Sequence, residues 1–457
     1  MLKFYLIADT HYYKPKNFKM GLAYTTFMEK EQKCCIENGA ICDATLDTIK
    51  NDDSIDTIII PGDLTQFGLM SSHNLFRDKL YELKKANKKV FLIPAGHDFD
   101  KNAREFNNDS WHYTEPTNKS ILLDFYKDFG ISDAISIEPN TTSYSADIND
   151  EYRMIAILCD FESEYGEITE NLLNWIKTQN NLAKKANKKV FAICHYPIIP
   201  NKPIFELFKE SKVSNWRYTA SQLADMGIKI VFTGHLHIQS VNLFTSEKGN
   251  TLVDVCTSTL IGYPAMYRKI TLVEDKAIIG SIPMTPCEFN GQLVDTKYLD
   301  NQFRNMIQNN LTKIGLDDFG KLRKESDYKY PYLIKQHSKL RHWLISHTLQ
   351  PLLKKLKLRT IGIFLFIKID KLRKKIRLVD FLEPILHGFL EGDNYYNTDS
   401  FEYVFLEKLF KRFRLFLRIA NNKLNSNGQN FDIAKLFLDS LIKPNSYSDN
   451  NCTIELT

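Results

Sequence analysis

The chain lacks a long hydrophobic run, and this absence argues against a helix that crosses a membrane. Its longest uninterrupted apolar stretch, residues 361–367, is far shorter than the ~18 residues that a spanning helix needs. We expect no signal peptide, because the short apolar segment at the N-terminus passes directly into a polar motif at Asp9. We therefore expect a soluble protein without a transmembrane segment.

Paired cysteines are also missing. The chain has eight cysteines, but none are spaced as the C-x-x-C pairs of zinc ribbons or redox motifs. Cys159 and Cys194 lie at the ends of strongly apolar runs, where a reduced, buried thiol is the simplest interpretation. The cysteines and serines form no Cys–His pair or nucleophile elbow. This usage favours a cytoplasmic location over a disulfide-stabilised, secreted protein.

Excess positive charge is confined to one window. The whole chain carries a net charge of +5, whereas residues 351–380 hold ten basic and two acidic residues. That window therefore contributes +8 and leaves −3 for the remainder. We expect the solvated face of an amphipathic helix here. The alternative is a surface for peripheral contact with an anionic membrane or nucleic acid.

The order of apolar runs predicts an α/β domain followed by a helical one. A length of 457 residues suggests two or three domains. Short runs rich in Val, Ile and Phe are typical of strands buried on both faces, and they occur at residues 4–8, 57–60, 90–93, 154–158, 190–193, 228–232 and 252–255. Between them, residues 73–86 and 169–186 have leucines at helical spacing. We predict domains at 1–285 and 290–443, and a loosely ordered tail at 444–457.

An eight-residue segment occurs twice in the predicted α/β domain. Residues 84–91 and 184–191 both read Lys-Lys-Ala-Asn-Lys-Lys-Val-Phe. Each copy is typical of a helix end, a turn and a buried strand, and each is followed by a histidine, His97 or His195. Two βα units would bring both histidines to one crevice, since binding sites lie beyond the carboxyl ends of the strands.

Acidic and histidine residues follow the predicted strands in five places. They are Asp9-Thr10-His11, Gly62-Asp63, Gly96-His97-Asp98, His195 and Gly234-His235-Leu236-His237. Carboxylates and imidazoles are good ligands for Zn, Mn and Fe ions. Residues two apart in an extended strand end point the same way, so both can reach one ion. Each motif alone is weak evidence, because a Gly-Asp after a strand is usually a turn. The ordered set points to a metal site.

This ordered set resembles the calcineurin-like metallophosphoesterase family, whose motifs are Asp-x-His, Gly-Asp, Gly-Asn-His-Asp/Glu, His and Gly-His-x-His. The resemblance covers roughly residues 1–285, and residues 62–68 are similar to the family's Gly-Asp-Leu-Thr-x-x-Gly. It implies a four-layer αββα sandwich with two divalent metal ions, Mn, Fe or Zn. Carried over residue by residue, it implies that the ligands are Asp9, His11 and His237 for one ion, Asp63 as the bridge, and His195 and His235 for the other.

The family's mechanism implies roles for the remaining motif residues. Two ions would activate a bridging water, and the resulting hydroxide would attack phosphorus. The resemblance places His97 near the leaving oxygen, as an acid or a charge stabiliser. We predict that Asp98 orients the ring of His97 and holds its imidazolium form. One position departs from the family: Gly96 stands where the family has a metal-binding asparagine. We therefore expect the second ion to bind weakly.

Three classes of function are compatible with these features. The first is a phosphoesterase that acts on a phosphomonoester or phosphodiester. The second is a binding or regulatory protein that kept the fold and lost turnover, which Gly96 would explain. The third is an adaptor that acts through its basic helical domain on a membrane or nucleic acid. The sequence does not identify the phosphorylated substrate, because many substrates are served by this fold.

Overall fold

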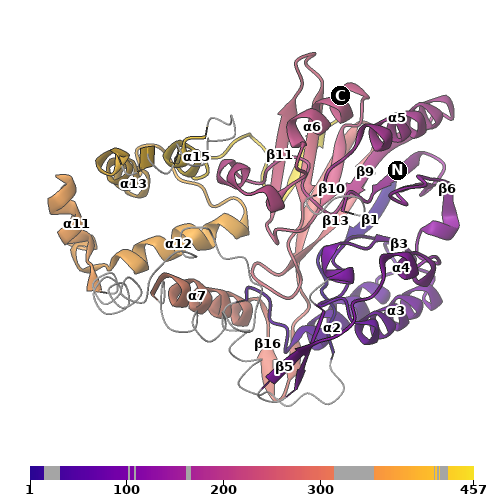
Figure 1. The fold of residues 1–457 in the computed structure, drawn as a ribbon, viewed down its shortest axis with the longest axis horizontal. Coiled ribbons are helices and arrows are strands. Elements are labelled where there is room, and N and C mark those ends of the chain that lie inside the picture. Colours follow the sequence, from indigo (N-terminus) through magenta and orange to yellow (C-terminus); the bar gives the residue numbers. More distant parts are fainter. Residues whose placement is uncertain are drawn as a thin grey trace.

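Two mixed β-sheets stack face to face at the centre of the molecule (Figure 1). The computed structural model describes residues 1–14, 31–100, 103–107, 110–160, 166–312, 355–415, 417–418, 421 and 431–456. The first sheet has the order β17 (Cys452–Glu455), β14 (Lys276–Pro283), β13 (Met266–Val273), β1 (Leu2–Leu6), β2 (Thr57–Pro61) and β3 (Lys89–Ile93). The second has the order β11 (Ser240–Thr245), β12 (Thr251–Cys256), β10 (Ile230–Thr233), β9 (Lys189–Cys194), β8 (Tyr152–Ile157), β7 (Tyr144–Asp147) and β6 (Ala134–Ile137).

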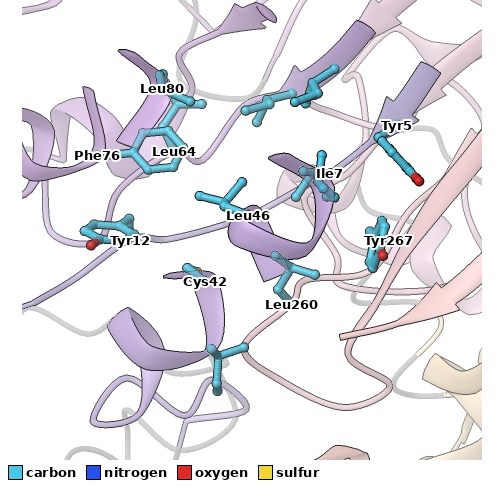
Figure 2. Close-up of a cluster of buried hydrophobic side chains, with 14 of the residues drawn as sticks. Tyr5, Ile7, Tyr12, Cys42, Leu46, Leu64, Phe76, Leu80, Leu260 and Tyr267 are labelled. Carbon is cyan, nitrogen blue, oxygen red and sulfur yellow. The ribbon is translucent and has the colours of Figure 1, made fainter. Parts of the chain in front are cut away.

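Successive side chains of a central strand point to opposite faces of its sheet, and this divides the core into layers. In β1, Phe4 and Leu6 point between the sheets, whereas Tyr5 points to the outer face of the first sheet. There it packs in a cluster with residues of α2 (Asn38–Lys50) and α3 (Met70–Lys85), shown in Figure 2. On the far side, α5 (Glu170–Lys185) and α6 (Trp216–Asp225) cover the second sheet. The predicted four-layer αββα sandwich is confirmed.

The two copies of the repeated segment fold alike. Each begins at the end of a helix, α3 or α5, and enters a parallel strand, β3 at the edge of the first sheet or β9 in the middle of the second. The asparagine of each turn adopts a left-handed backbone, with φ of 60° at Asn87 and 55° at Asn187. Asparagine tolerates this conformation better than most residues with a side chain. The predicted helix, turn and buried strand are therefore present in both copies.

The helices described after residue 295 pack beside the sandwich (Figure 1). They are α7 (Thr296–Thr312), α11 (Leu358–Leu365), α12 (Leu378–Glu391), α13 (Phe401–Arg412) and α15 (Ile433–Asp439). The last four share a hydrophobic core of their own, whereas α7 packs between Tyr263 and α12. Backbone contacts such as Gln239 N to Leu390 O at 3.0 Å join the helices to the sheets. None of the helices in the described ranges is long and apolar enough to cross a membrane. The exact domain boundaries stay predictions.

Two sequence-based expectations about this region are wrong. The tail at 444–457 was expected to be loose, but β17 extends the first sheet and fully buries Ile454. Asp449 holds the tail further, since its carboxylate accepts hydrogen bonds from Val241 N and Tyr395 Oη. The basic window is not one amphipathic helix. Its residues 351–354 lie outside the described ranges, and α11 stops before Phe366, whose φ of 56° is left-handed.

Candidate metal centre

All five sequence motifs meet at one edge of the stacked sheets. The motif residues follow β1, β2 and β3 in the first sheet and β9 and β10 in the second. Within each sheet these strands run parallel. Their carboxyl ends therefore meet at a shared crevice. The predicted ligands come together there as overlapping groups of carboxylate and imidazole atoms.

The first group contains Asp9, His11 and His237, whose ligand atoms all lie within 4.8 Å of one another. The Nε2 atoms of His11 and His237 are 3.0 Å apart. Asp9 Oδ1 lies 3.5 Å from His237 Nε2 and 3.9 Å from His11 Nε2. All three side chains are buried. This is the set that the resemblance implied for one ion.

The second group contains Asp63, His195 and His235. His195 Nε2 is 3.2 Å from Asp63 Oδ2 and 3.2 Å from His235 Nδ1. Asp63 Oδ2 also lies 3.6 Å from His11 Nε2, so one carboxylate contacts both groups. That is the position a bridging ligand needs, because two ions in such sites lie about 3.5–4 Å apart.

The chemistry of this donor set fits divalent cations. The Nδ1 atom of His11 is buried without a hydrogen-bond partner among the described residues, although its Nε2 faces the other donors. Burial, then the charge of Lys33, holds the pKa of His11 well below its usual range. Burial, then the charge of His195, lowers the pKa of His235 to about 4. Both imidazoles are thus neutral at pH 7, as metal ligands must be.

His195 is the exception among these imidazoles. Burial lowers its pKa, but the adjacent carboxylate of Asp63 outweighs burial and raises the pKa to about 10. Without a metal cation, the protonated ring of His195 therefore balances the negative charge of Asp63. A divalent ion would displace that proton, so its binding should release protons.

Five of these residues hold strained backbone conformations. The φ angles are left-handed at Asp9 (53°), His11 (41°), Asp63 (50°), His235 (77°) and His237 (58°). Such conformations cost on the order of 1–3 kcal/mol each for residues with a side chain, and they cluster at functional sites. Strain repeated at neighbouring loops indicates that the positions of these side chains matter more than local stability.

Hydrogen bonds from surrounding residues hold these loops in place. Asn38 donates to His11 O at 2.6 Å, and Thr259 donates to Asp9 O at 2.6 Å. The carboxylate of Asp9 accepts from His235 N at 2.9 Å. Gly234 permits this contact, because a Cβ at that position would lie 2.3 Å from Asp9 Oδ2. The glycine of the last motif is therefore required by close packing.

Asp98 does not have the role we predicted. Its carboxylate accepts hydrogen bonds from Leu64 N, Thr65 N and Ala95 N, at 3.1, 2.8 and 2.8 Å. The Nδ1 atom of His97 has no partner among the described residues, so Asp98 does not orient that ring. Burial, then the charge of Asp63, raises the pKa of Asp98 to about 7. Asp98 instead joins the loops of the second and third motifs.

His97 lies beside both groups. Its backbone N–H donates to Asp63 Oδ1 at 3.0 Å, and its ring centroid is 4.7 Å from that of His11. The ligand atoms of His11, Asp63 and His97 also lie within 4.8 Å of one another. The side chain is therefore close enough either to contact a substrate at the metals or to serve as a ligand.

Three residues near the site were missed by sequence reasoning. Gln32 Oε1 lies 3.0 Å from His237 Nδ1 and fixes that ring. Lys33 is buried, and its Nζ donates to Gln66 Oε1 at 3.1 Å. Neither residue lies in a recognisable motif. Asp160 is buried with Oδ2 unpartnered among the described residues, and it follows the predicted strand 154–158. Its position after a buried strand, like that of the motif carboxylates, could have identified Asp160 as a candidate site residue.

The structure permits a direct test of the missing asparagine. A Cβ added to Gly96 would meet no atom within 4 Å. Gly96→Asn should therefore fit, add an oxygen ligand and lower the metal concentration needed for half-maximal activity. We expect a shift of at least about tenfold, since even an outer-shell partner changes metal affinity by about 10–100-fold. Metal titrations of activity, with Gly96→Ala as the control that adds a side chain without a ligand, measure this shift.

Elemental analysis of the wild-type protein can contradict the hypothesis of a weak second site. If elemental analysis after purification without added metal finds two tightly held ions per chain, another group has replaced the asparagine and the weak-site hypothesis is wrong. Asp160 is a candidate for that group, because its buried Oδ2 has no hydrogen-bond partner among the described residues. Loss of one ion in Asp160→Asn would then identify it.

Known proteins are similar to this chain in sequence or in structure. A family model described as calcineurin-like phosphoesterase matches residues 2–239. A dimetal phosphatase from Danio rerio is similar in structure, with 13% identity over 61% of this chain and 95% of that chain, at a TM-score of 0.44. A purple acid phosphatase from yellow lupin seeds has 12% identity over 64% and 52% of the two chains, at 0.37. The NAD nucleotidase of Haemophilus influenzae has 12% identity over 66% and 55%, at 0.31. The comparison with curated protein sequences found no match.

Proposed function

This chain belongs to the calcineurin-like phosphoesterase family, and on that premise we propose that it hydrolyses a phosphomonoester or phosphodiester at a site for two divalent metal ions. The observation that carries the proposal is the position of Asp63, whose carboxylate lies 3.6 Å from His11 Nε2 and 3.2 Å from His195 Nε2. One carboxylate between two groups of donors suits a pair of ions better than a single ion.

The described residues divide into ligands and supporting residues. We propose that Asp9, His11 and His237 hold one ion, that His195 and His235 hold the other, and that Asp63 contacts both. The nitrogen and oxygen donors suit Mn, Fe or Zn. When bound, such ions polarise phosphoryl oxygens and lower the pKa of water toward neutrality.

Residues around the ligands prepare the site for this chemistry. Gln32 fixes the ring of His237, with 3.0 Å between its Oε1 and Nδ1. Lys33 contributes positive charge that lowers the pKa values of His11 and His97. We propose that the side chain of His97 donates a hydrogen bond to an oxygen of the bound phosphoryl group.

A panel of substrates tests the proposed function. Aryl phosphate monoesters, aryl phosphate diesters and nucleotides should be assayed with added Mn²⁺ and again after exhaustive chelation. We expect at least one class to be hydrolysed with Mn²⁺ and none after chelation. Full activity after chelation would contradict metal dependence. A protein that binds two ions and cleaves none of the substrates would favour a binding role instead.

A further inference from the structure

Large apolar side chains are exposed on α11, in the segment after it and just beyond α13. In Figure 1, α11 is the helix that lies furthest from the sheets. Leu372 is 89% exposed, Phe366 87%, Leu415 72% and Ile363 69%. With Phe364 and Phe413, which are also exposed, we call these residues the apolar rim. Single exposed apolar residues are common, but a group of this size marks an interaction surface.

Two helices contribute to the apolar rim and meet there. The rings of Phe364 and Phe413 lie 6.2 Å apart, so the ends of α11 and α13 are in contact. The guanidinium of Arg412 lies over the ring of Phe364, 4.8 Å from its centroid. Ile363 and Phe366 flank Phe364 in the sequence, and Leu415 follows Phe413 by two residues. Cationic and apolar groups are thus interleaved on one surface.

The sequence of α11 explains why Ile363 and Phe364 remain exposed. Leu358, Ile361 and Leu365 form the buried stripe that joins the helical core. Ile363 and Phe364 occupy the opposite side of the same short helix and are exposed. Arg359 and Thr360 lie on that exposed side as well. The helix is therefore amphipathic, but its outer side also carries two large apolar groups.

The segment that carries Ile363, Phe364, Phe366 and Leu372 is rich in positive charge. Exposed basic residues of the described window are Lys355, Lys357, Arg359, Lys368, Lys371, Lys374, Lys375 and Arg377. Its acidic residues, Asp370 and Asp380, pair locally with Arg373 and Arg377. Among the described residues, no acidic group pairs with the lysines of this window. The segment that carries most of the rim is therefore strongly cationic, which makes it complementary to an anionic surface.

We propose that the apolar rim docks on the surface of an anionic lipid bilayer. Phe366 and Leu372 would enter the boundary between headgroups and acyl chains, and the surrounding lysines would contact lipid phosphates. Nucleic acid fits less well, because its phosphate backbone is charged but offers no apolar region for the two most exposed side chains. A lipid bilayer offers charged phosphates and an apolar interior at the same surface.

Co-sedimentation of the full chain with lipid vesicles tests the proposal. Binding to vesicles of mixed phosphatidylcholine and phosphatidylglycerol should exceed binding to phosphatidylcholine alone and should weaken with added salt. Phe366→Ser combined with Leu372→Ser should reduce partitioning about tenfold or more, since two large apolar side chains are lost. Lys371→Glu combined with Lys374→Glu should have a similar effect. These four residues are exposed, and thermal melting checks that the variants fold.

A matched control lies on α5 in the sandwich. Leu182 and Lys185 are exposed there, so Leu182→Ser with Lys185→Glu makes the same kinds of change elsewhere and should bind like the wild type. Three results would overturn the proposal: no vesicle binding, equal loss in the control, or unchanged binding of the Phe366→Ser, Leu372→Ser variant. Binding to duplex DNA without binding to vesicles would assign the face to nucleic acid instead. None of these readouts requires metal or turnover.

Discussion

Asp63→Asn should abolish most metal-dependent phosphoester hydrolysis. We expect a loss of more than about 100-fold, because removing even an outer-shell partner of a metal costs about 10–100-fold. The amide introduced by this substitution would keep the shape of the side chain and could still accept the hydrogen bond from His97 N, which is 3.0 Å long in the wild type. It would lack the negative charge that lies between His11 and His195. The expected defect is therefore in metal binding and turnover, with little change in the fold.

Activity, metal content and thermal unfolding should be measured together for this variant. Asp254→Asn is the matched control, because Asp254 is equally buried but accepts hydrogen bonds from Ile198 N and Ile199 N, at 2.7 and 2.9 Å. We expect the control to lose stability and to keep its metal content per folded chain. An Asp63→Asn protein with wild-type turnover and two bound ions would rule out Asp63 as the bridge.

The parallel strands could be predicted because burial on both faces leaves a simple signal in the sequence. All seven predicted runs correspond to strands, from β1 to β12, and those within each sheet are mutually parallel. The strands that were missed, such as β13 and β14, pair antiparallel. Their residues alternate between buried and partly exposed. That alternation over a few residues resembles many other local patterns, so periodicity alone did not identify them.

The tail could not be predicted for a different reason. Its Asn and Ser residues are typical of loops, but here such side chains bond to the backbone, as Asn445 Oδ1 accepts from Tyr447 N at 2.8 Å. The decisive contact is the pairing of β17 with β14. That pairing joins segments far apart in the sequence and leaves no signal in either one.

The convergence of the motif residues at one site could be predicted from the order of the strands. The motifs follow parallel strands, so their convergence followed from topology. The role of Asp98 could not be predicted in this way. We expected it to contact the ring of His97 because the two residues are adjacent in the sequence. The segment Gly96–Phe99 is a 3₁₀ turn, in which the Asp98 carboxylate reaches back to Ala95 N. Gln32 and Lys33 approach the site from a segment without any motif, and only the folded chain reveals them.

His97→Ala should leave metal binding intact and reduce turnover by about 10²–10⁴-fold, the usual contribution of a general acid or base. The backbone N–H of residue 97, which holds Asp63, is kept in this variant. Burial, then the charge of Lys33, lowers the pKa of His97 to about 4. Its imidazole is therefore neutral at pH 7 before substrate binds. A neutral ring can donate a hydrogen bond to a phosphoryl oxygen, whereas proton donation requires the substrate's negative charge to raise that pKa.

Two further variants separate these possibilities. His97→Gln keeps a hydrogen-bond donor without a titratable group, so partial recovery relative to alanine would assign His97 a neutral hydrogen bond, and no recovery would assign proton transfer. His112→Ala removes an exposed histidine, whose side chain is 63% accessible, and should behave as the wild type. Metal analysis is decisive for the hypothesis as a whole. Because His97 shares a ligand-atom group with His11 and Asp63, loss of one ion in His97→Ala would make it the ligand that replaces the missing asparagine.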